Sequence, residues 1–440
     1  MDGTGSEVLV TEGAMGTMLQ KFGLNVNGGA GIYNLTEPQL VCEVHKRYRA
    51  AGSQCAITNT FNPCVSEDVA DIKTAAEINA AAVRIAREAG YDIVLGDCGP
   101  CSLLMEPLGQ ATFDRVVEVY KRHFSSLAKA GVEAFLLETF IDIADLRAAI
   151  LAARSVDAGK PVIACCSFKK DNMATFLSST KPAAFAVIAE SLGASMVGLN
   201  CGFGPEESEV ALEQISSATT LPLIVEPNAG IPDIDDDGTP HYPGTPEQQA
   251  AYSKRYADLG ARIIGSCCGS DPDFTIAIAN AIEGYEPPAV RPHDGCTRLA
   301  SACDVLVSED GALDLSGMYV IDVSNGEFDK WDVLENTVCC PFIVEYGSAS
   351  TPDYANLEEA LKVYPGRAVV QMQTVDSLGA ETAAYYGSAV VIPMECGSVD
   401  AIARCAIDSG IKPRDVLIGI GGPFEPDMDP SAVEMRVWKS

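Results

Sequence analysis

The stretch RIIGSCCGS (262–270) joins a short apolar run to two adjacent cysteines, Cys267 and Cys268, which are flanked by small residues. On a regular strand, neighbouring side chains point to opposite faces of the sheet. Glycine permits an irregular backbone that could turn both sulfur atoms toward one point. The chain offers a contrast in VIACCSF (162–168), where two cysteines lie within an apolar run and are predicted to be buried on a strand.

The run RIIG is the last of eight short apolar runs that alternate with longer helical patterns. The eight strands are predicted at 7–11, 54–58, 92–97, 134–138, 161–167, 195–200, 222–226 and 262–265, and the helical patterns include 37–52, 74–90, 113–131 and 246–260. Glycines near several helix ends are C-cap signals. Eight such units favour a TIM (β/α)8 barrel, which takes about 250 residues. A doubly wound open sheet is the alternative.

A Pro-rich stretch, YEPPAVRPHDG (285–295), interrupts the alternation and is typical of a linker. Further strands are predicted at 318–323, 341–346, 367–372, 388–394 and 415–420, with helices at 356–364 and 398–410. This part is too short for a second complete barrel. We therefore expect a TIM barrel over 1–288, a linker over 289–297 and a smaller, incomplete-barrel-like α/β domain over 298–440. The barrel or a second chain is expected to cover the open sheet edges.

The composition excludes several classes of partner. The chain has 61 acidic and 30 basic residues and a formal net charge of −31, which argues against nucleic acid and anionic membranes. No apolar run is long enough to span a membrane, and the N-terminus lacks the features of a signal peptide. Sixteen cysteines in such a chain indicate reduced thiols or a metal site in the cytoplasm. Self-association stays open.

In a TIM barrel the chemistry lies where the strands end. Cys201 follows the sixth predicted strand, and Cys267 and Cys268 follow the eighth, so all three sulfur atoms are expected at one mouth. Three cysteine ligands with a fourth position open are typical of a catalytic zinc site. The alternative for Cys201 is a small buried residue. His241, after the seventh strand, is expected to be a solvated loop histidine. The alternative, in which it is a fourth ligand, would indicate a structural site.

Six segments together resemble the homocysteine S-methyltransferase family over residues 7–283. They are TEGAMGTMLQ (11–20), ITNTF (57–61), LLETF (136–140), GLNCG (198–202), PNAGIP (227–232) and GSCCGS (265–270). The resemblance implies that Cys201, Cys267 and Cys268 bind Zn²⁺. It also implies that the chain transfers a methyl group to the thiol of homocysteine to give methionine.

The substrate contacts follow from the same matching positions. We expect Glu138 and Glu12 to hold the substrate ammonium. For Glu138, the alternative is a structural carboxylate that caps a loop. Backbone amides are expected to hold the substrate carboxylate, from Gly13, Ala14, Met15, Gly16 and Thr17. Asn228 is expected to shape the loop after the seventh strand. The family usually has aspartate at the position of Glu12 and glycine at that of Ser266, and both differences could shift substrate preference.

The methyl donor is indicated by two further resemblances. The form GAMGTMLQ (13–20) resembles cobalamin-dependent methionine synthases more than the single-domain enzymes that use S-methylmethionine. NLEEALKVYPGRAVVQ (356–371), YYGSAVVIPMECG (385–397) and SGIKPRDVLIG (409–419) resemble part of the pterin-binding domain of methionine synthases. VEYGS (344–348) and QMQTV (371–375) replace polar residues expected there, so no methylfolate site is expected.

No cobalamin-binding module appears in the chain, so methylcobalamin is expected from a separate corrinoid protein. Two alternatives stay open. The first is S-methylmethionine or S-adenosylmethionine as donor. The second is a non-catalytic subunit that binds zinc and thiols within a methyltransferase assembly.

Overall fold

The structure is a computed structural model of the 440-residue chain. It describes residues 7–26, 29–62, 69–169, 180–235, 240–289, 294, 296–303, 305–308, 312–313, 318–323, 329–337, 342–345, 353–394, 396, 398–420 and 434–437.

The first part of the chain contains an eight-stranded parallel sheet, in the order β1-β10-β7-β6-β5-β4-β3-β2. Its strands are β1 (Leu9–Val10), β2 (Cys55–Ile57), β3 (Ile93–Cys98), β4 (Ala134–Phe140), β5 (Val162–Cys166), β6 (Met196–Asn200), β7 (Leu223–Glu226) and β10 (Ala261–Ile264). Each corresponds to one predicted strand. The sheet curls so that β1 meets β2, where Thr11 forms a bridge with Cys55 and the Gln54 amide donates to the Val10 carbonyl at 2.8 Å. The predicted TIM barrel is confirmed.

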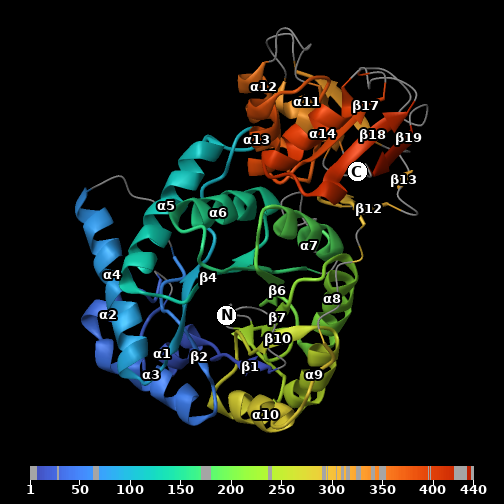
Figure 1. Ribbon diagram of the computed structural model, residues 1–440. Helices are drawn as coiled ribbons and strands as arrows, with labels where there is room; N and C mark the ends of the chain where they lie inside the picture. The colour runs from blue at the N-terminus through green and yellow to red at the C-terminus, as the bar shows by residue number, and fades with distance from the viewer. Residues whose placement is uncertain are drawn as a thin grey trace. The chain divides into compact units, whose positions relative to one another are not determined.

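Helices follow the strands as the pattern predicted. They are α1 (Met15–Lys21), α2 (Tyr33–Thr36), α3 (Pro38–Ala50), α4 (Val69–Glu88), α5 (Phe113–Ala130), α6 (Ile143–Val156), α7 (Pro182–Ser191), α8 (Pro205–Ala218), α9 (Pro246–Asp258) and α10 (Pro272–Ile282). Figure 1 shows α3–α6 and α8–α10 in a ring around the strands. Local signals fix their ends: Thr245 and Gln248 form a capping box at the start of α9, and Gly131 follows α5 at φ 91°.

The barrel interior is filled by apolar side chains that alternate along the strands. Cys55, Leu95, Leu136, Cys165 and Ile263 belong to one buried cluster in the barrel. Both faces of each parallel strand are covered, which explains why the strands read as continuous apolar runs. The cysteine pair in β5 is buried, as predicted. Because the interior is closed, a ligand site has to lie at the strand ends.

The chain divides into two compact units by its contacts. The first comprises 1–103, 114–178 and 194–291, and the second comprises 292–440 together with 104–113 and 179–193. The second unit therefore takes in α7. The proposed linker at 289–297 falls partly on residues outside those described.

The second unit contains a seven-stranded sheet in the order β13-β19-β18-β17-β16-β15-β14. Five parallel strands match the predicted ones: β14 (Tyr319–Asp322), β15 (Phe342–Glu345), β16 (Val369–Gln371), β17 (Ala389–Pro393) and β18 (Val416–Ile420). The helices are α11 (Lys330–Thr337), α12 (Tyr354–Val363), α13 (Ser377–Tyr385) and α14 (Val399–Asp408), with a 3₁₀ turn at Pro413–Asp415. The strands follow one another in sequence order, as in a barrel that stops short of closure.

One expectation about this sheet is wrong. The edge of β18 is not left for the barrel or a second chain, because β19 (Glu434–Val437) pairs with it antiparallel. On its other side β19 pairs with β13 (Ala312–Leu313), also antiparallel. The sequence of β19 is short and carries two charged residues, so its strand pattern is weak.

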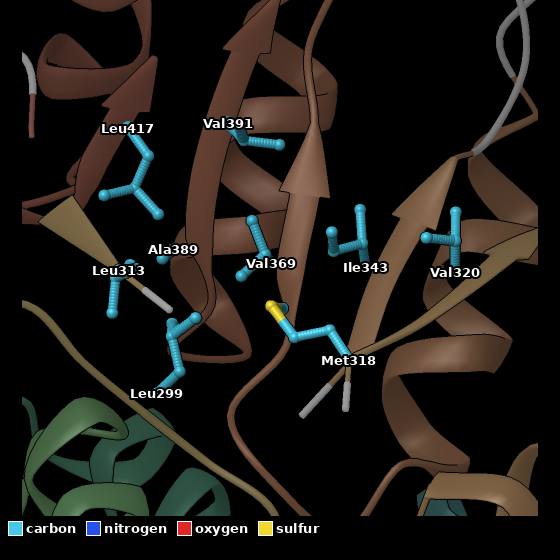
Figure 2. Close-up of a cluster of buried hydrophobic side chains, with 9 residues drawn as sticks. All are labelled: Leu299, Leu313, Met318, Val320, Ile343, Val369, Ala389, Val391 and Leu417. Atoms are coloured by element: carbon cyan, nitrogen blue, oxygen red, sulfur yellow. The ribbon is translucent and has the colours of Figure 1, made fainter. Parts of the chain in front are cut away.

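A hydrophobic cluster covers one face of the second sheet, as Figure 2 shows. Met318, Ile343, Val369, Val391 and Leu417 are among its buried residues. Leu299 joins it from β11 (Arg298–Ala300), which forms an antiparallel hairpin with β12 (Val305–Val307). In a complete barrel this face would be enclosed by further strands, and here the hairpin contributes to covering it.

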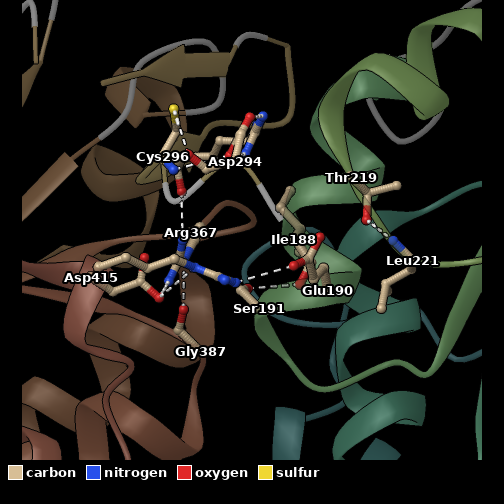
Figure 3. Close-up of polar contacts among 12 residues, drawn as sticks. Ile188, Glu190, Ser191, Thr219, Leu221, Asp294, Cys296, Arg367, Gly387 and Asp415 are labelled. Atoms are coloured by element: carbon tan, nitrogen blue, oxygen red, sulfur yellow. Dashed lines mark hydrogen bonds and ion pairs between the residues drawn. The ribbon is translucent and has the colours of Figure 1, made fainter. Parts of the chain in front are cut away.

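A buried ion pair joins Arg367, just before β16, to Asp415, just before β18 (Figure 3). The Arg367 guanidinium lies 2.7 Å from the Asp415 carboxylate and donates to the Gly387 carbonyl at 2.9 Å. It also donates to the Arg298 carbonyl at 2.6 Å. Both charged side chains are buried, so the pair holds its two partners in fixed positions.

Candidate functional site

A cavity of about 560 Å³ opens at the carboxyl ends of the barrel strands. Residues at the carboxyl ends of seven of the eight strands, or in the segments that follow them, line the cavity, including Glu12, Asp97, Glu138, Glu226 and the three cysteines. Gly13, Ala14, Met15, Gly16 and Thr17 line it as well. Nearly all of the residues predicted for the site are thus brought to one cavity. Asn228 and His241 are not among the lining residues.

The three cysteines meet at the wall of this cavity. The sulfur atoms of Cys201, Cys267 and Cys268 all lie within 4.8 Å of one another, and those of Cys201 and Cys268 are 3.8 Å apart. With Zn–S bonds of about 2.3 Å, two sulfur atoms of a tetrahedral site lie about 3.8 Å apart. The donor set therefore fits zinc in size and in ligand type.

The backbone explains how sulfur atoms from two strands reach one point. Cys201 has φ 57°, a left-handed conformation that turns the chain sharply after β6. Gly202 follows at φ 66°, and a Cβ atom there would lie 2.5 Å from the Phe168 carbonyl oxygen, so only glycine fits. Main-chain hydrogen bonds hold the loop after β10, which carries Cys267 and Cys268. The Cys267 amide donates to the Pro227 carbonyl at 2.7 Å, and the Ala229 amide donates to the Cys268 carbonyl at 2.9 Å.

Hydrogen bonds couple the three thiols to one another. Hydrogen bonds from Cys267 and Cys268 favour the Cys201 thiolate and lower the pKa of Cys201. The same bonds with Cys201 raise the pKa of Cys267 and that of Cys268. Cysteine ligands lose their protons when a metal binds, and the hydrogen bonds at Cys201 already favour its thiolate form.

His241 does not join this cluster. It lies on β9 (Pro240–His241), paired with β8 (Asp233–Ile234), and its Nε2 atom is 2.6 Å from Asp235 on the exposed surface. Within the described part of the chain, only the three cysteines form a group that could hold a metal. The alternative of a four-ligand structural site with His241 thus finds no support in the geometry.

Three carboxyl groups lie on the cavity wall beside the sulfur atoms. Burial raises the pKa of Glu138 to about 7, while a hydrogen bond with Asp97 lowers it. Burial and the charge of Glu138 raise the pKa of Asp97 and bring that of Glu226 to about 8. Repulsion between like charges adds to burial in raising these pKa values, and a bound cation would offset that repulsion.

Glu12 is already engaged by the protein. Its two carboxylate oxygens lie 2.8 and 2.9 Å from Nδ1 of the buried His45, and Oε2 accepts from the Ile57 amide at 3.1 Å. The longer side chain of glutamate, compared with the aspartate usual in the family, reaches His45 on α3. The role of Glu12 in holding the substrate ammonium stays a prediction, and the structure adds that His45 and the Ile57 amide already bind its carboxylate.

The glycine-rich turn after β1 presents its amides at the cavity. Ala14 donates to the Ser270 hydroxyl at 3.3 Å, so this amide is used within the protein. Met15, Gly16 and Thr17 form the first turn of α1, where backbone N–H groups lack an intrahelical acceptor. These three remain the best candidates for binding an anionic group.

Asn228 lies behind the sulfur cluster. It is buried, its amide donates to the Phe203 carbonyl at 3.0 Å, and its side chain hydrogen bonds to Cys201. Ser266, the other departure from the family pattern, is buried in the cavity wall. Its hydroxyl has no hydrogen-bond partner among the described residues.

Sequence reasoning missed four residues of the site: Asn200, Asp97, Glu226 and His45. Asn200 and Glu226 each end an otherwise apolar strand, and Asp97 is the penultimate residue of another. A polar residue that closes an apolar run at the barrel mouth is a signal that could have found these three. His45 sits within an ordinary helical pattern, and nothing in the sequence marks it.

No helix in the described ranges has the length and apolar character needed to cross a membrane.

Comparisons with known proteins agree with this geometry. The family model described as "Homocysteine S-methyltransferase" matches residues 9–282. The methionine synthase of Mycobacterium leprae (strain TN) is 32% identical over 295 residues, which are 62% of this chain and 24% of that protein. The methionine synthase of Mycobacterium tuberculosis (strain ATCC 25618 / H37Rv) is 28% identical over 437 residues, which are 93% of this chain and 36% of that protein. The chain thus spans between a quarter and about a third of these relatives.

Solved structures of the homocysteine methyltransferase MmuM from Escherichia coli share the barrel. Its metallated and oxidized forms each match with a TM-score of 0.50 and 23% identity. The matches cover 62% of this chain and 96% and 95% of the respective MmuM chains. At this identity the likeness shows the fold.

Proposed function

Because the chain belongs to the homocysteine S-methyltransferase family, as its motifs predicted, we propose that it transfers a methyl group to the thiol of homocysteine to give methionine. The observation that carries this proposal is the cluster of three sulfur atoms at the wall of a cavity of about 560 Å³. A thiol substrate can enter this cavity beside the cluster. No histidine base is needed at the sulfur.

Cys201, Cys267 and Cys268 would hold Zn²⁺ through three thiolates. Zinc supplies Lewis acidity, which lowers the pKa of a bound thiol so that its sulfur is nucleophilic near neutral pH. Three protein ligands leave one tetrahedral position for the substrate, as in catalytic sites. Asn228 would support the Cys201 thiolate by its side-chain hydrogen bond.

The polar ends of homocysteine match the other groups of the cavity. Glu138, with Asp97 beside it, would hold the ammonium through charge-assisted hydrogen bonds. The amides of Met15, Gly16 and Thr17 would hold the carboxylate. Glu12 would keep the wall in place through His45 and would contact the ammonium only as a second partner.

We propose a methylcorrinoid on a separate protein as the methyl donor. The similarity to two methionine synthases, one of which is matched over 93% of this chain, supports this choice over a sulfonium donor. The proposed location is the cytoplasm, where a chain with sixteen cysteines stays reduced.

The test incubates methylcobalamin with homocysteine and the zinc-loaded chain. Loss of the methyl group from the cobalamin is monitored by its visible spectrum. Cys268→Ser is the matched control because it removes one sulfur ligand and keeps the shape. We expect methionine from the wild type and none from the variant. S-methylmethionine and S-adenosylmethionine are the second and third arms, and a product from either alone would replace the corrinoid as donor. Stoichiometric zinc binding without turnover in any arm would favour the non-catalytic subunit.

A further inference from the structure

Asn200 is the last residue of β6 and is fully buried beside the cavity. Its side-chain oxygen accepts from the Thr139 amide at 2.7 Å. Its Nδ2 atom lies 2.9 Å from the Thr139 hydroxyl and 2.9 Å from Glu138 Oε2. The same nitrogen is 3.9 Å from the Cys267 sulfur. One amide therefore contacts the candidate ammonium ligand and a candidate zinc ligand.

The residues that Asn200 contacts on β4 have an unusual backbone. Thr139 has φ 63°, which is strained for a β-branched side chain. The pairing of β4 with β5 shifts between Leu137 and Phe140, so an irregularity interrupts the end of the strand. Irregularities of this kind re-aim side chains next to active sites. Here the re-aimed side chain is Glu138.

The hydrogen bonds show what holds this conformation. Asn200 binds both the backbone and the hydroxyl of Thr139, so it fixes the strained residue from two directions. An amide NH₂ group has two hydrogens, and the two oxygen acceptors at 2.9 Å use both. The sulfur at 3.9 Å is a weaker third neighbour. The main effect of Asn200 is therefore expected on Glu138 and not on metal affinity.

We propose that Asn200 is a positioning residue, which aims the Glu138 carboxylate at the amino group of the thiol substrate. The proposal rests on the function proposed above and adds the origin of amino-group selectivity. Cys201 directly follows Asn200 in the chain, so the distance from the sulfur cluster to the carboxylate is set through one short segment. A substrate with its amino group at the matching distance from its thiol is selected.

The test measures selectivity for the amino group by calorimetric titration of the zinc-loaded chain. The two probes are homocysteine and 4-mercaptobutyrate, which is homocysteine without the amino group. A hydrogen bond to a charged group is worth about 1.5–3 kcal/mol, so the wild type should prefer homocysteine by about tenfold to a hundredfold. Asn200→Ala should reduce this preference by about tenfold, with the zinc content unchanged and 4-mercaptobutyrate bound about as well.

Two variants separate positioning from general damage. Asn79→Ala removes another buried, hydrogen-bonded side-chain amide, on α4, which is distant in sequence from Asn200. This variant should leave the preference for homocysteine over 4-mercaptobutyrate intact. Thr139→Gly relieves the strain at φ 63° and removes the hydroxyl contact with Asn200, while it keeps the backbone amide bond to Asn200 and the Asn200–Glu138 bond. It should also keep the preference, and in the double variant with Asn200→Ala it should restore stability but not selectivity.

The outcomes are distinct. If the wild type prefers homocysteine and Asn200→Ala prefers it equally, the positioning role is overturned while the proposed function stands. An equal loss of affinity for both thiols would also overturn it, because that result indicates a structural role. If the wild-type chain binds neither thiol, the proposed function fails and this inference fails with it.

Discussion

Gly269 offers the sharpest test of how the sulfur loop is built. It follows Cys268 at φ 81°, in the left-handed region that favours glycine. A Cβ atom at this position would lie 2.2 Å from Cγ and 2.5 Å from Cβ of Tyr242. The change Gly269→Ala therefore meets two obstacles, one in the backbone and one in the packing of Tyr242 against the loop.

Each obstacle has an expected cost in the free energy of unfolding. An L-residue in the left-handed region costs about 1–2 kcal/mol. Overpacking against a side chain that cannot move freely adds about 1–3 kcal/mol. Gly269→Ala should therefore lower the free energy of unfolding of the barrel by about 2–5 kcal/mol. The loop should also shift, so the affinity of the chain for zinc should fall.

Gly131→Ala is the matched control. Gly131 has φ 91°, and no described atom lies within 4 Å of the position its Cβ would take. This variant should cost only the backbone strain. Trp331 and Trp438 both follow the barrel in the sequence, so tryptophan fluorescence is not a specific probe of it. Hydrogen exchange of barrel peptides in increasing urea should be measured, with zinc affinity from competition with a chromophoric chelator.

A second change identifies the clash. In a Tyr242→Ala background, Gly269→Ala should cost no more than Gly131→Ala does in the wild type. The coupling energy between the two positions should be about 1–3 kcal/mol. If Gly269→Ala and Gly131→Ala are equally destabilising in the wild type, or if zinc affinity is unchanged, the packing of Tyr242 does not hold the sulfur loop.

Three further predictions concern other buried groups. Burial lowers the pKa of His123 to about 4, so between about pH 6.5 and 4 the unfolded chain binds a proton that the folded chain does not. The free energy of unfolding should therefore fall by about 3 kcal/mol as the pH falls through this range. If the free energy of unfolding of His123→Gln has the same pH slope as that of the wild type, this prediction is contradicted. Glu138→Gln should keep zinc binding but weaken homocysteine binding by about tenfold, measured by calorimetry against 4-mercaptobutyrate, and an unchanged ratio would remove Glu138 from the ammonium site. Arg367→Met removes the nearer of the two cationic partners of the buried Asp415 carboxylate and should destabilise the second unit by about 3–5 kcal/mol in urea unfolding. The double change with Asp415→Leu should recover part of this loss, because the Gly387 and Arg298 carbonyls still lack the Arg367 donor.

The barrel could be predicted from sequence because its signal is repeated. Each of the eight strands is a short apolar run buried on both faces, and each was expected within a few residues of its observed place. The cysteine cluster was equally accessible, since the rule that barrel chemistry lies at strand ends places Cys201 beside Cys267.

Features that depend on long-range packing were not accessible in this way. The bond between Glu12 and His45 joins β1 to a helix, and only the folded chain shows that Glu12 is already occupied. The strained conformation of Thr139 has no signal in the segment LLETF, because the residue that holds it, Asn200, is distant in sequence. Strand β19 was missed because pairing, and not its own composition, makes it a strand.

The position of β19 has a consequence for how the second unit is made on the ribosome. Its residues pair with β18 on one side and with β13 on the other, where Leu313 lies opposite Met435. The order of the sheet therefore cannot be completed until nearly the whole unit has left the exit tunnel. Contacts of such large sequence separation form slowly, and until then the edge of β18 stays exposed to pairing with other chains.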